Sequence, residues 1–185
     1  MRCFIAIELP AGVRERLMQL SARLRRCPVR ASWVHGDHVH LTLRFLGDVT
    51  DDACNTVRTD LRNRVAAASS FELHVQGAGA FPNLRNPSVI WAGAGPLAGA
   101  LETVQSLCEA AAQGIGLARE PRPFHPHIPL ARVKDFRPPA GLEQAIERER
   151  IFTAGEFVVP GVSLFQSALT PRGPVYTRLE EFRFT

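Results

Sequence analysis

Apolar residues recur along the chain with two spacings, which alternate and predict interleaved strands and helices. Residues 3–9 are almost continuously apolar and end at Pro10, which indicates a buried strand closed by a turn. A spacing of three to four residues follows and predicts a helix, whose buried side would consist of Val13, Leu17, Leu20 and Leu24. The first part of the chain is therefore expected to form a strand followed by an amphipathic helix.

The same two patterns continue along the rest of the chain. Helical spacing of apolar side chains predicts helices over residues 53–65, 96–112 and 142–148. Apolar and aromatic runs predict strands over residues 33–46, 71–81, 88–92, 157–159, 163–169 and 175–184. Because the two kinds of element are interleaved and no low-complexity linker divides them, we expect one domain over residues 1–185, of α+β or α/β class.

One short motif occurs twice, each time inside an apolar run, at residues 40–43 (His-Leu-Thr-Leu) and 127–130 (His-Ile-Pro-Leu). Alternate side chains of a strand share a face, so His40, Thr42 and Arg44 are expected to lie together. Histidine titrates near neutral pH, and two histidines on facing strands can supply a base and an acid. A hydroxyl and a guanidinium beside them can hold an anion. The repeated motif therefore indicates acid–base chemistry at a phosphodiester.

The two matching histidine strands also bear on the fold class. They favour a two-lobed α+β cleft over a doubly wound sheet, which would need a glycine-rich phosphate turn. Two other readings of the histidines stay open. A lone strand histidine is most often structural, and the pairs His38/His40 and His125/His127 could instead ligate a metal in a metallohydrolase. Against the metal, neither strand carries a matching aspartate or glutamate, and Pro126 distorts the second pair.

Charge and cysteine usage narrow the class of protein further. The net charge is +4, and almost every basic residue is arginine, since Lys134 is the sole lysine. Arginine suits phosphate, but codon bias explains the same composition, so an RNA partner is permitted and not established. The four cysteines are scattered, which predicts free thiols in a reducing compartment. No secretory signal and no apolar run of membrane-spanning length is present, so we expect a cytoplasmic protein.

The order and spacing of several segments resemble the 2H phosphoesterases, specifically the bacterial RNA 2′,3′-cyclic phosphodiesterases, also called 2′–5′ RNA ligases. The similarity covers nearly the whole chain. Each segment is weakly specific alone, but together they are specific. They are residues 2–7, 33–34, 40–47, 124–132, 164–169 and 173–176.

The resemblance implies a bilobal fold in which two antiparallel sheets flank a central cleft, with helices outside. It implies that His127 is the general base and His40 the general acid, and that Thr42 and Arg132 bind the phosphate. Strand alternation adds Arg44 as a weaker phosphate-binding candidate. The expected reaction opens a terminal 2′,3′-cyclic phosphate to a 2′-phosphate, with 2′–5′ ligation in some members. No metal or organic cofactor is expected.

The sequence departs from the family at Pro129, where the family has threonine. Proline has neither a hydroxyl nor a backbone N–H, so a phosphate contact is lost. A lost hydrogen bond to a charged group costs about 1.5–3 kcal/mol, roughly 10- to 100-fold in rate or affinity. We expect weakened activity, and the alternative is a non-catalytic protein that binds RNA ends.

Strand parity raises a second difficulty, because Arg132 follows His127 by five positions and strict alternation would put them on opposite faces. A bulge or the end of the strand must redirect Arg132 if it serves the phosphate, and the alternative is a surface ion pair. The candidate rim residues are His38, His125 and Phe124, whereas Trp33 is expected in the core. The expected partners are RNA 3′ ends or small cyclic nucleotides, bound by a monomer.

Overall fold

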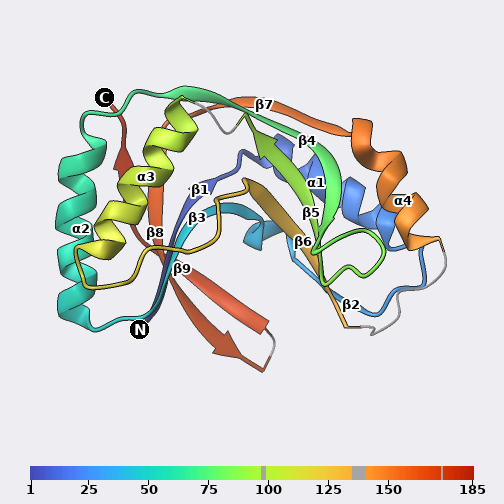
Figure 1. Cartoon of the computed structure of the whole chain (residues 1–185), viewed down its shortest axis with the longest axis horizontal. Helices are drawn as coiled ribbons and strands as arrows, with labels where there is room; N and C mark the ends of the chain where they lie inside the picture. Colours follow the sequence, from blue (N-terminus) through green and yellow to red (C-terminus); the bar gives the residue numbers. More distant parts are fainter. Residues whose placement is uncertain (97–98, 135–140, 172) are drawn as a thin grey trace.

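The computed structural model describes residues 1–96, 99–134, 141–171 and 173–185. Within these residues the strands form two antiparallel sheets (Figure 1). Sheet A has the strand order β3-β1-β8-β9, with bounds His40–Asp48, Arg2–Glu8, Gly161–Thr170 and Gly173–Arg183. Sheet B has the order β2-β6-β5-β4-β7, with bounds Ala31–Trp33, His127–Val133, Val89–Gly95, Phe71–Phe81 and Thr153–Val159.

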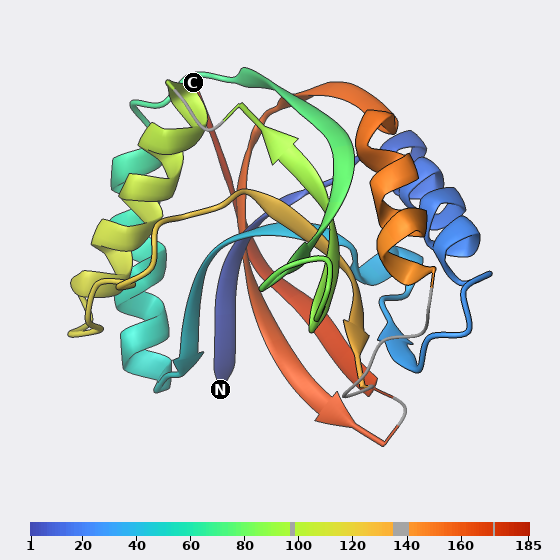
Figure 2. The ribbon, with the colours of Figure 1, turned by 45° about the vertical axis from the view of Figure 1, so that its right-hand side comes forward.

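The four α-helices described cover the outer faces of the sheets. Helices α2 (Asp51–Val65) and α3 (Ala100–Gln113) pack on sheet A, and α1 (Ala11–Leu24) and α4 (Leu142–Arg148) pack on sheet B (Figures 1 and 2). The inner faces are turned toward each other, and β3 of sheet A contacts β6 of sheet B. The α+β class and the arrangement of two antiparallel sheets with helices outside are confirmed.

The core follows the apolar spacing of the sequence. Helix α1 buries the four predicted residues Val13, Leu17, Leu20 and Leu24. Strand β1 is buried over its five central residues because α2 and α3 cover one side of sheet A. The buried apolar residues of both sheets form one continuous cluster. Hydrophobic burial of this extent is the main favourable contribution to folding, and here it joins the two halves of the chain.

Several predicted elements have different bounds in the structure; the strand predicted over residues 157–159, for example, begins earlier, at Thr153. The expected strand over residues 33–46 is interrupted by a 3₁₀ turn at Gly36–His38, because Gly36 and Asp37 favour a turn, and His38 N donates to His35 O at 2.9 Å. The expected helix over residues 96–112 begins at Ala100, after Gly99, whose φ of 56° is left-handed. Residues 97 and 98 lie outside the described residues, so Leu97 cannot be placed.

The cysteines and the helices bear on two further expectations. The four cysteines are free, as predicted. Burial raises the pKa of Cys3 to about 11 and that of Cys108 to about 12, so both thiols stay protonated and unreactive at neutral pH. No helix of the described ranges combines the length and the apolar character needed to cross a bilayer.

Candidate active site

The two motif histidines begin the two strands that contact each other between the sheets. His40 is the first residue of β3 in sheet A, and His127 is the first residue of β6 in sheet B. In both strands the second motif residue, Leu41 or Ile128, is buried in the core. This anchoring turns each histidine toward the inner face of its sheet. The structure thus places the two residues that the repeated motif singled out at the starts of two strands that contact each other.

Both imidazoles are held by the same hydrogen bond. His40 Nδ1 lies 2.8 Å from the carbonyl oxygen of His38, and His127 Nδ1 lies 2.7 Å from that of His125. Because a carbonyl oxygen only accepts, Nδ1 carries the proton in each ring. In the neutral ring Nε2 is therefore left unprotonated and can accept a proton. Each ring thus has one nitrogen fixed by the backbone and one nitrogen for chemistry.

His40 lies among aromatic rings on the inner face of sheet A. The Phe4 ring stacks on it with centroids 4.8 Å apart, and the Tyr176 ring meets it edge-on at 5.3 Å. These rings exclude water and disfavour the charged imidazolium. Burial accordingly lowers the pKa of His40 to about 4. In the free protein His40 is therefore neutral at physiological pH.

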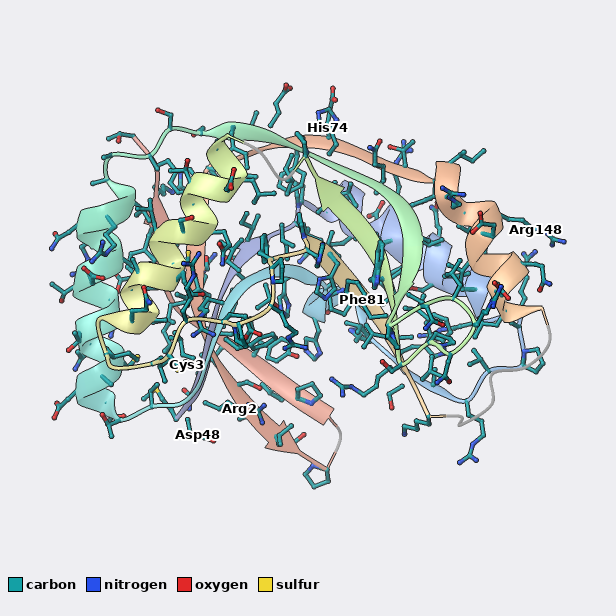
Figure 3. The ribbon with its side chains drawn as sticks, viewed as in Figure 1. Arg2, Cys3, Asp48, His74, Phe81 and Arg148 are labelled. Atoms are coloured by element: carbon teal, nitrogen blue, oxygen red, sulfur yellow. The ribbon has the colours of Figure 1, made fainter. Side chains whose placement is uncertain are left out.

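His127 is less enclosed and lines an open groove on sheet B. Phe81 of β4, which is labelled in Figure 3, meets its ring edge-on at 4.9 Å, and the Trp91 ring lies 6.5 Å away. Gly93 pairs with His127 and leaves the floor of the groove bare, because a Cβ there would lie 2.6 Å from the Gln76 carbonyl oxygen. Burial lowers the pKa of His127 as well. Among the residues lining the groove are His74, Gln76, Phe81, Trp91, His125 and His127.

A bulge in β3 decides the position of the first motif's arginine. Thr42 pairs with Ala6, but the next residue of β1, Ile5, pairs with Arg44, so Leu43 is extra. Thr42 consequently shares the face of His40, and Arg44 is turned to the opposite face. The prediction that His40, Thr42 and Arg44 share one face is therefore wrong for Arg44.

The partners of Arg44 show what it does instead. Its Nε lies 3.1 Å from Glu109 Oε2 of α3, and one terminal nitrogen donates to the Ala118 carbonyl oxygen at 2.5 Å. Glu120 is a second carboxylate partner at 3.7 Å. These contacts tie β3 to the helix layer. We therefore leave Arg44 out of the proposed phosphate site.

A second bulge, in β6, has the opposite consequence for Arg132. Pro129 pairs with Trp91, whereas the next residue of β5, Ile90, pairs with Ala131, so Leu130 is extra. The change of parity places the exposed Arg132 on the face of His127 and Pro129. The bulge that the spacing required is thus present.

Pro129 is accommodated because β6 is only partly flanked by strands. Among the described residues, β5 pairs with β6 at Pro129, while β2 pairs with it only from Ala131 to Val133. Proline is tolerated at such an edge and beside a bulge, since no ladder hydrogen bond is required of its nitrogen. The ring supplies no hydroxyl at the position where the resemblance implies a threonine.

The candidate rim residues differ in their surroundings. The His38 ring lies 5.0 Å from that of Tyr176, and the exposed His125 lines the groove beside His127. Phe124 is partly buried and packs against the core, and Trp33 does the same, as expected for Trp33. In the ranges that the structure describes, no three His, Cys, Asp or Glu residues gather as a potential metal site. The His-x-His pairs therefore gain no further ligand.

Sequence reasoning missed the aromatic residues that enclose the histidines. The sequence pattern does not single out Phe4, Phe81 or Phe165, and it includes Tyr176 only as part of the family-like segment 173–176. Their alternation along strands is a weak signal, because core aromatics show the same spacing. Pairing of β1 with both β3 and β8 is what brings the Phe4 ring beside those of His40 and Phe165.

Comparison with known proteins agrees with this geometry. The family model described as LigT-like phosphoesterase matches residues 7–91 and again 93–176, so that each match contains one histidine motif. A protein of Methanothermobacter thermautotrophicus is 32% identical over 183 residues, 98% of both chains. One of Thermotoga maritima is 32% identical over 185 residues, 100% of this chain and 96% of its own. Both are named RNA 2′,3′-cyclic phosphodiesterase.

Solved structures agree in fold over the full chain. The crystal structure of a Thermus thermophilus protein has a TM-score of 0.81 at 31% identity and covers 100% of this chain and 98% of its own. That of Escherichia coli LigT complexed with 3′-AMP has a TM-score of 0.79 at 28% identity, with the same coverage. These matches confirm the resemblance to 2H phosphoesterases. The chain belongs to the LigT-like phosphoesterase family.

Proposed function

We propose that this protein is an RNA 2′,3′-cyclic phosphodiesterase that opens the terminal cyclic phosphate to a 2′-phosphate by two-histidine acid–base catalysis. The observation that carries the proposal is the matched pair His40 and His127, each fixed through Nδ1 on facing strands. The relatives named RNA 2′,3′-cyclic phosphodiesterase support the same substrate. Residues 1–185 would act together as one bilobal domain, without a metal or organic cofactor.

In the proposed reaction His127 Nε2 takes a proton from water, and the water oxygen forms a bond to phosphorus. The bond from phosphorus to O3′ breaks on the opposite side, because nucleophile and leaving group lie roughly in line. His40 Nε2–H gives its proton to O3′. The product is a 2′-phosphate beside a free 3′-hydroxyl. In ligation, an RNA 5′-hydroxyl would take the place of water and attack the same cyclic phosphate.

This division of work requires His40 to be protonated when substrate is bound. Burial holds the pKa of His40 at about 4 in the free protein. An anionic phosphate beside the ring favours the imidazolium and raises that pKa. The Nδ1–H bond to the His38 carbonyl persists in both protonation states, so the ring need not reorient. Substrate binding would thus charge the general acid.

Thr42 and Arg132 are proposed to hold the non-bridging oxygens, one from each sheet. In support, Thr42 lies two residues from His40 without an intervening bulge, and the bulge at Leu130 puts Arg132 on the face of His127. Charge-assisted hydrogen bonds of this kind strengthen as negative charge builds on the phosphoryl oxygens. Small cyclic nucleotides would meet the same groups. We propose further that the protein acts as a cytoplasmic monomer.

The test is turnover of a short RNA that ends in a 2′,3′-cyclic phosphate, with EDTA present. Wild type is expected to form the 2′-phosphate, and His40→Ala and His127→Ala are each expected to lose about 10²–10⁴-fold, the usual contribution of general acid–base catalysis. His35→Ala is the matched control, because its side chain is 77% exposed. Circular dichroism of each variant separates lost chemistry from lost folding.

Any of three results would overturn this mechanism. Full activity in one of the two histidine variants would remove that histidine from the reaction. Tight binding of the RNA without turnover would make the protein an RNA-end binder, which the missing hydroxyl at Pro129 would then explain. Activity abolished by EDTA would instead favour the metallohydrolase alternative.

A further inference from the structure

The groove beside His127 is much larger than hydrolysis requires. Its volume is about 580 Å³. A water molecule occupies about 30 Å³ in the liquid, whereas ligand-binding pockets usually measure about 300–1,000 Å³. A water bound beside His127 would therefore leave most of the groove unused. The space suits a larger group that lies next to the proposed general base.

Strand pairing connects this groove to the histidine across the floor of sheet B. Gly93 of β5 pairs with His127 of β6 on one side and with Gln76 of β4 on the other. Neighbouring strands lie about 4.8 Å apart, so the backbones of Gln76 and His127 are about 10 Å apart. Gly93 has no side chain to fill this interval, and Gln76 is exposed. An open strip of backbone therefore leads from His127 to the Gln76 amide.

Aromatic rings and hydrogen-bonding side chains line the rest of the groove. The ring centroids of Phe81 and Trp91 are 5.1 Å apart, and Trp91 lies over Gly79, where any Cβ would clash with the indole. Further along β4, His74 Nδ1 lies 3.1 Å from Glu156 Oε2 of β7. Figure 3 labels His74 and Phe81, which are well separated along β4. Flat apolar faces flanked by hydrogen-bonding side chains are what a nucleobase requires.

The groove differs in charge from the neighbouring phosphate site. Its described lining residues include no lysine, arginine, aspartate or glutamate. Arg132 lies on the face of His127 but does not line the groove. Phosphate oxygens need cationic or N–H partners, so an anion is expected at Arg132, whereas the groove suits an uncharged part of the RNA. A nucleoside with a free 5′-hydroxyl is such a part.

The proposed reaction places its nucleophile on the side of this groove. Nucleophile and leaving group lie roughly in line, so the attacking oxygen enters opposite O3′, beside His127. In ligation the 5′-hydroxyl gives its proton to His127 Nε2 while O5′ forms a bond to phosphorus. The bond from phosphorus to O3′ breaks, and His40 protonates O3′. The nucleoside that carries the 5′-hydroxyl therefore has to lie beside His127, where the groove offers room for it.

We propose that the groove on sheet B binds the 5′-terminal nucleoside of a second RNA and thereby favours 2′–5′ ligation over hydrolysis. This inference rests on the proposed function and names the second substrate of the same site. The base would stack on the rings of Phe81 and Trp91, and the Gln76 amide would hydrogen-bond to its edge. A nucleoside in the groove occupies the position of the attacking water, so its binding replaces hydrolysis by ligation.

The experiment supplies the protein with a donor RNA that ends in a 2′,3′-cyclic phosphate and an acceptor RNA with a 5′-hydroxyl. Gel electrophoresis separates the 2′-phosphate from the ligated product. Gln76→Trp places a large ring in the groove and is expected to lower the ligation rate about tenfold, the usual effect of losing one stacked base, with hydrolysis of the donor alone nearly unchanged. For wild type, an acceptor whose 5′-terminal nucleotide lacks its base should also ligate about tenfold more slowly.

The matched control is Glu72→Trp. Glu72 is exposed and lies on the same face of β4 as Gln76, but it does not line the groove. Both substitutions add the same ring at an exposed position, so folding is expected to be kept and only the place of the ring differs. Glu72→Trp is expected to leave ligation and hydrolysis unchanged.

The possible outcomes separate the acceptor groove from the proposed function. Equal ligation by wild type and Gln76→Trp overturns the groove, and so does an equal fall in both activities, because the substitution would then act on chemistry that the two reactions share. Hydrolysis without any ligated product in wild type overturns the groove but leaves the proposed function standing. If wild type does neither, fluorescence anisotropy with the labelled acceptor RNA decides the groove separately. Gln76→Trp must then weaken binding that Glu72→Trp leaves unchanged.

Discussion

The two histidine strands, β3 and β6, share the same local construction but lie in different surroundings. Each half begins a strand with a histidine whose Nδ1 donates to the carbonyl of the residue two positions earlier. Each strand carries a bulge directly after the third motif position. Yet His40 is enclosed by aromatic rings, whereas His127 lines an open groove. The shared part orients two imidazoles, and the unshared part sets how readily each takes a proton.

The bulges explain why the arginines that follow the two motifs lie on different faces of their sheets. In β3 the arginine stands four positions after the histidine, and the bulge turns it out to Glu109 of α3. In β6 it stands five positions after the histidine, and the bulge puts Arg132 on the same face as His127. The same backbone device therefore produces a structural arginine in one half and an accessible one in the other.

The largest expected effects come from removing each arginine in turn, which tests whether Arg132 and Arg44 have different roles. Arg132→Ala is expected to lower kcat/KM about 10²–10³-fold with stability unchanged, because it removes charge stabilisation at the phosphate. Arg44→Ala is expected to lower the free energy of unfolding by about 3–5 kcal/mol, because it leaves the buried Glu109 carboxylate unpaired. Steady-state kinetics and urea unfolding measure the two effects.

A double variant is the control for Arg44→Ala. Arg44→Ala combined with Glu109→Ala removes the whole pair and should recover part of the lost stability, since no unpaired buried charge remains. The folded fraction of Arg44→Ala should turn over RNA at nearly the wild-type rate. A large fall in its kcat with the fold intact would return Arg44 to the phosphate site.

Much of the architecture could be predicted from sequence because it rests on local apolar spacing. The buried side of α1 and the limits of α4, Leu142–Arg148, follow directly from that spacing. The break at Gly36–His38 was missed, although Gly36 and Asp37 carry the turn signal, because the flanking residues read as one apolar stretch. Local signals therefore specify elements better than they specify the boundaries between them.

The candidate site likewise contains residues that local sequence signals predict and residues that they do not. His40 and His127 could be found because the motif repeats. The resemblance implied that the two histidine strands face each other. The position of Arg44 could not be found, because the bulge depends on how β3 registers against β1. The rings of Phe4 and Phe165 reach His40 through pairing of distant strands, which no local pattern records.

The third motif position differs between the two strands, and a substitution there is expected to increase activity. Thr42 and Pro129 occupy corresponding places beside the two histidines. Pro129→Thr is expected to raise kcat/KM about 10- to 100-fold, because a hydroxyl near the charged phosphate is worth about 1.5–3 kcal/mol. Single-turnover rates on the cyclic-phosphate RNA measure the gain. Pro129→Val is the control of similar shape without a hydroxyl, and an equal gain there would assign the effect to the backbone.

The enclosure of His40 predicts an acid-sensitive fold. Its folded pKa of about 4 lies below the ordinary value of 6.5, so the unfolded chain binds the proton more readily. The stabilisation is fully present above pH 6.5 and is lost as pH falls toward 4. Between pH 7 and pH 5 the loss due to His40 is about 2 kcal/mol.

The measurement is urea unfolding at several pH values in wild type, His40→Gln and His35→Gln. His40→Gln is expected to flatten the dependence between pH 7 and pH 5, whatever its stability at pH 7. The exposed His35 is expected to leave the slope unchanged. Equal slopes in wild type and His40→Gln would show that the aromatic rings do not hold His40 neutral.

The smallest expected effect is a shift between two pH profiles, and it addresses the division of work between the histidines. The profile of kcat/KM reports the free enzyme, in which burial lowers the pKa of both rings below 6.5. Its optimum should therefore lie on the acid side of pH 6.5. The profile of kcat reports the bound state, where the phosphate anion favours imidazolium, so its optimum should lie at higher pH. Coinciding optima would mean that substrate does not charge His40, and His127, the less enclosed ring, would then be the better candidate for the acid.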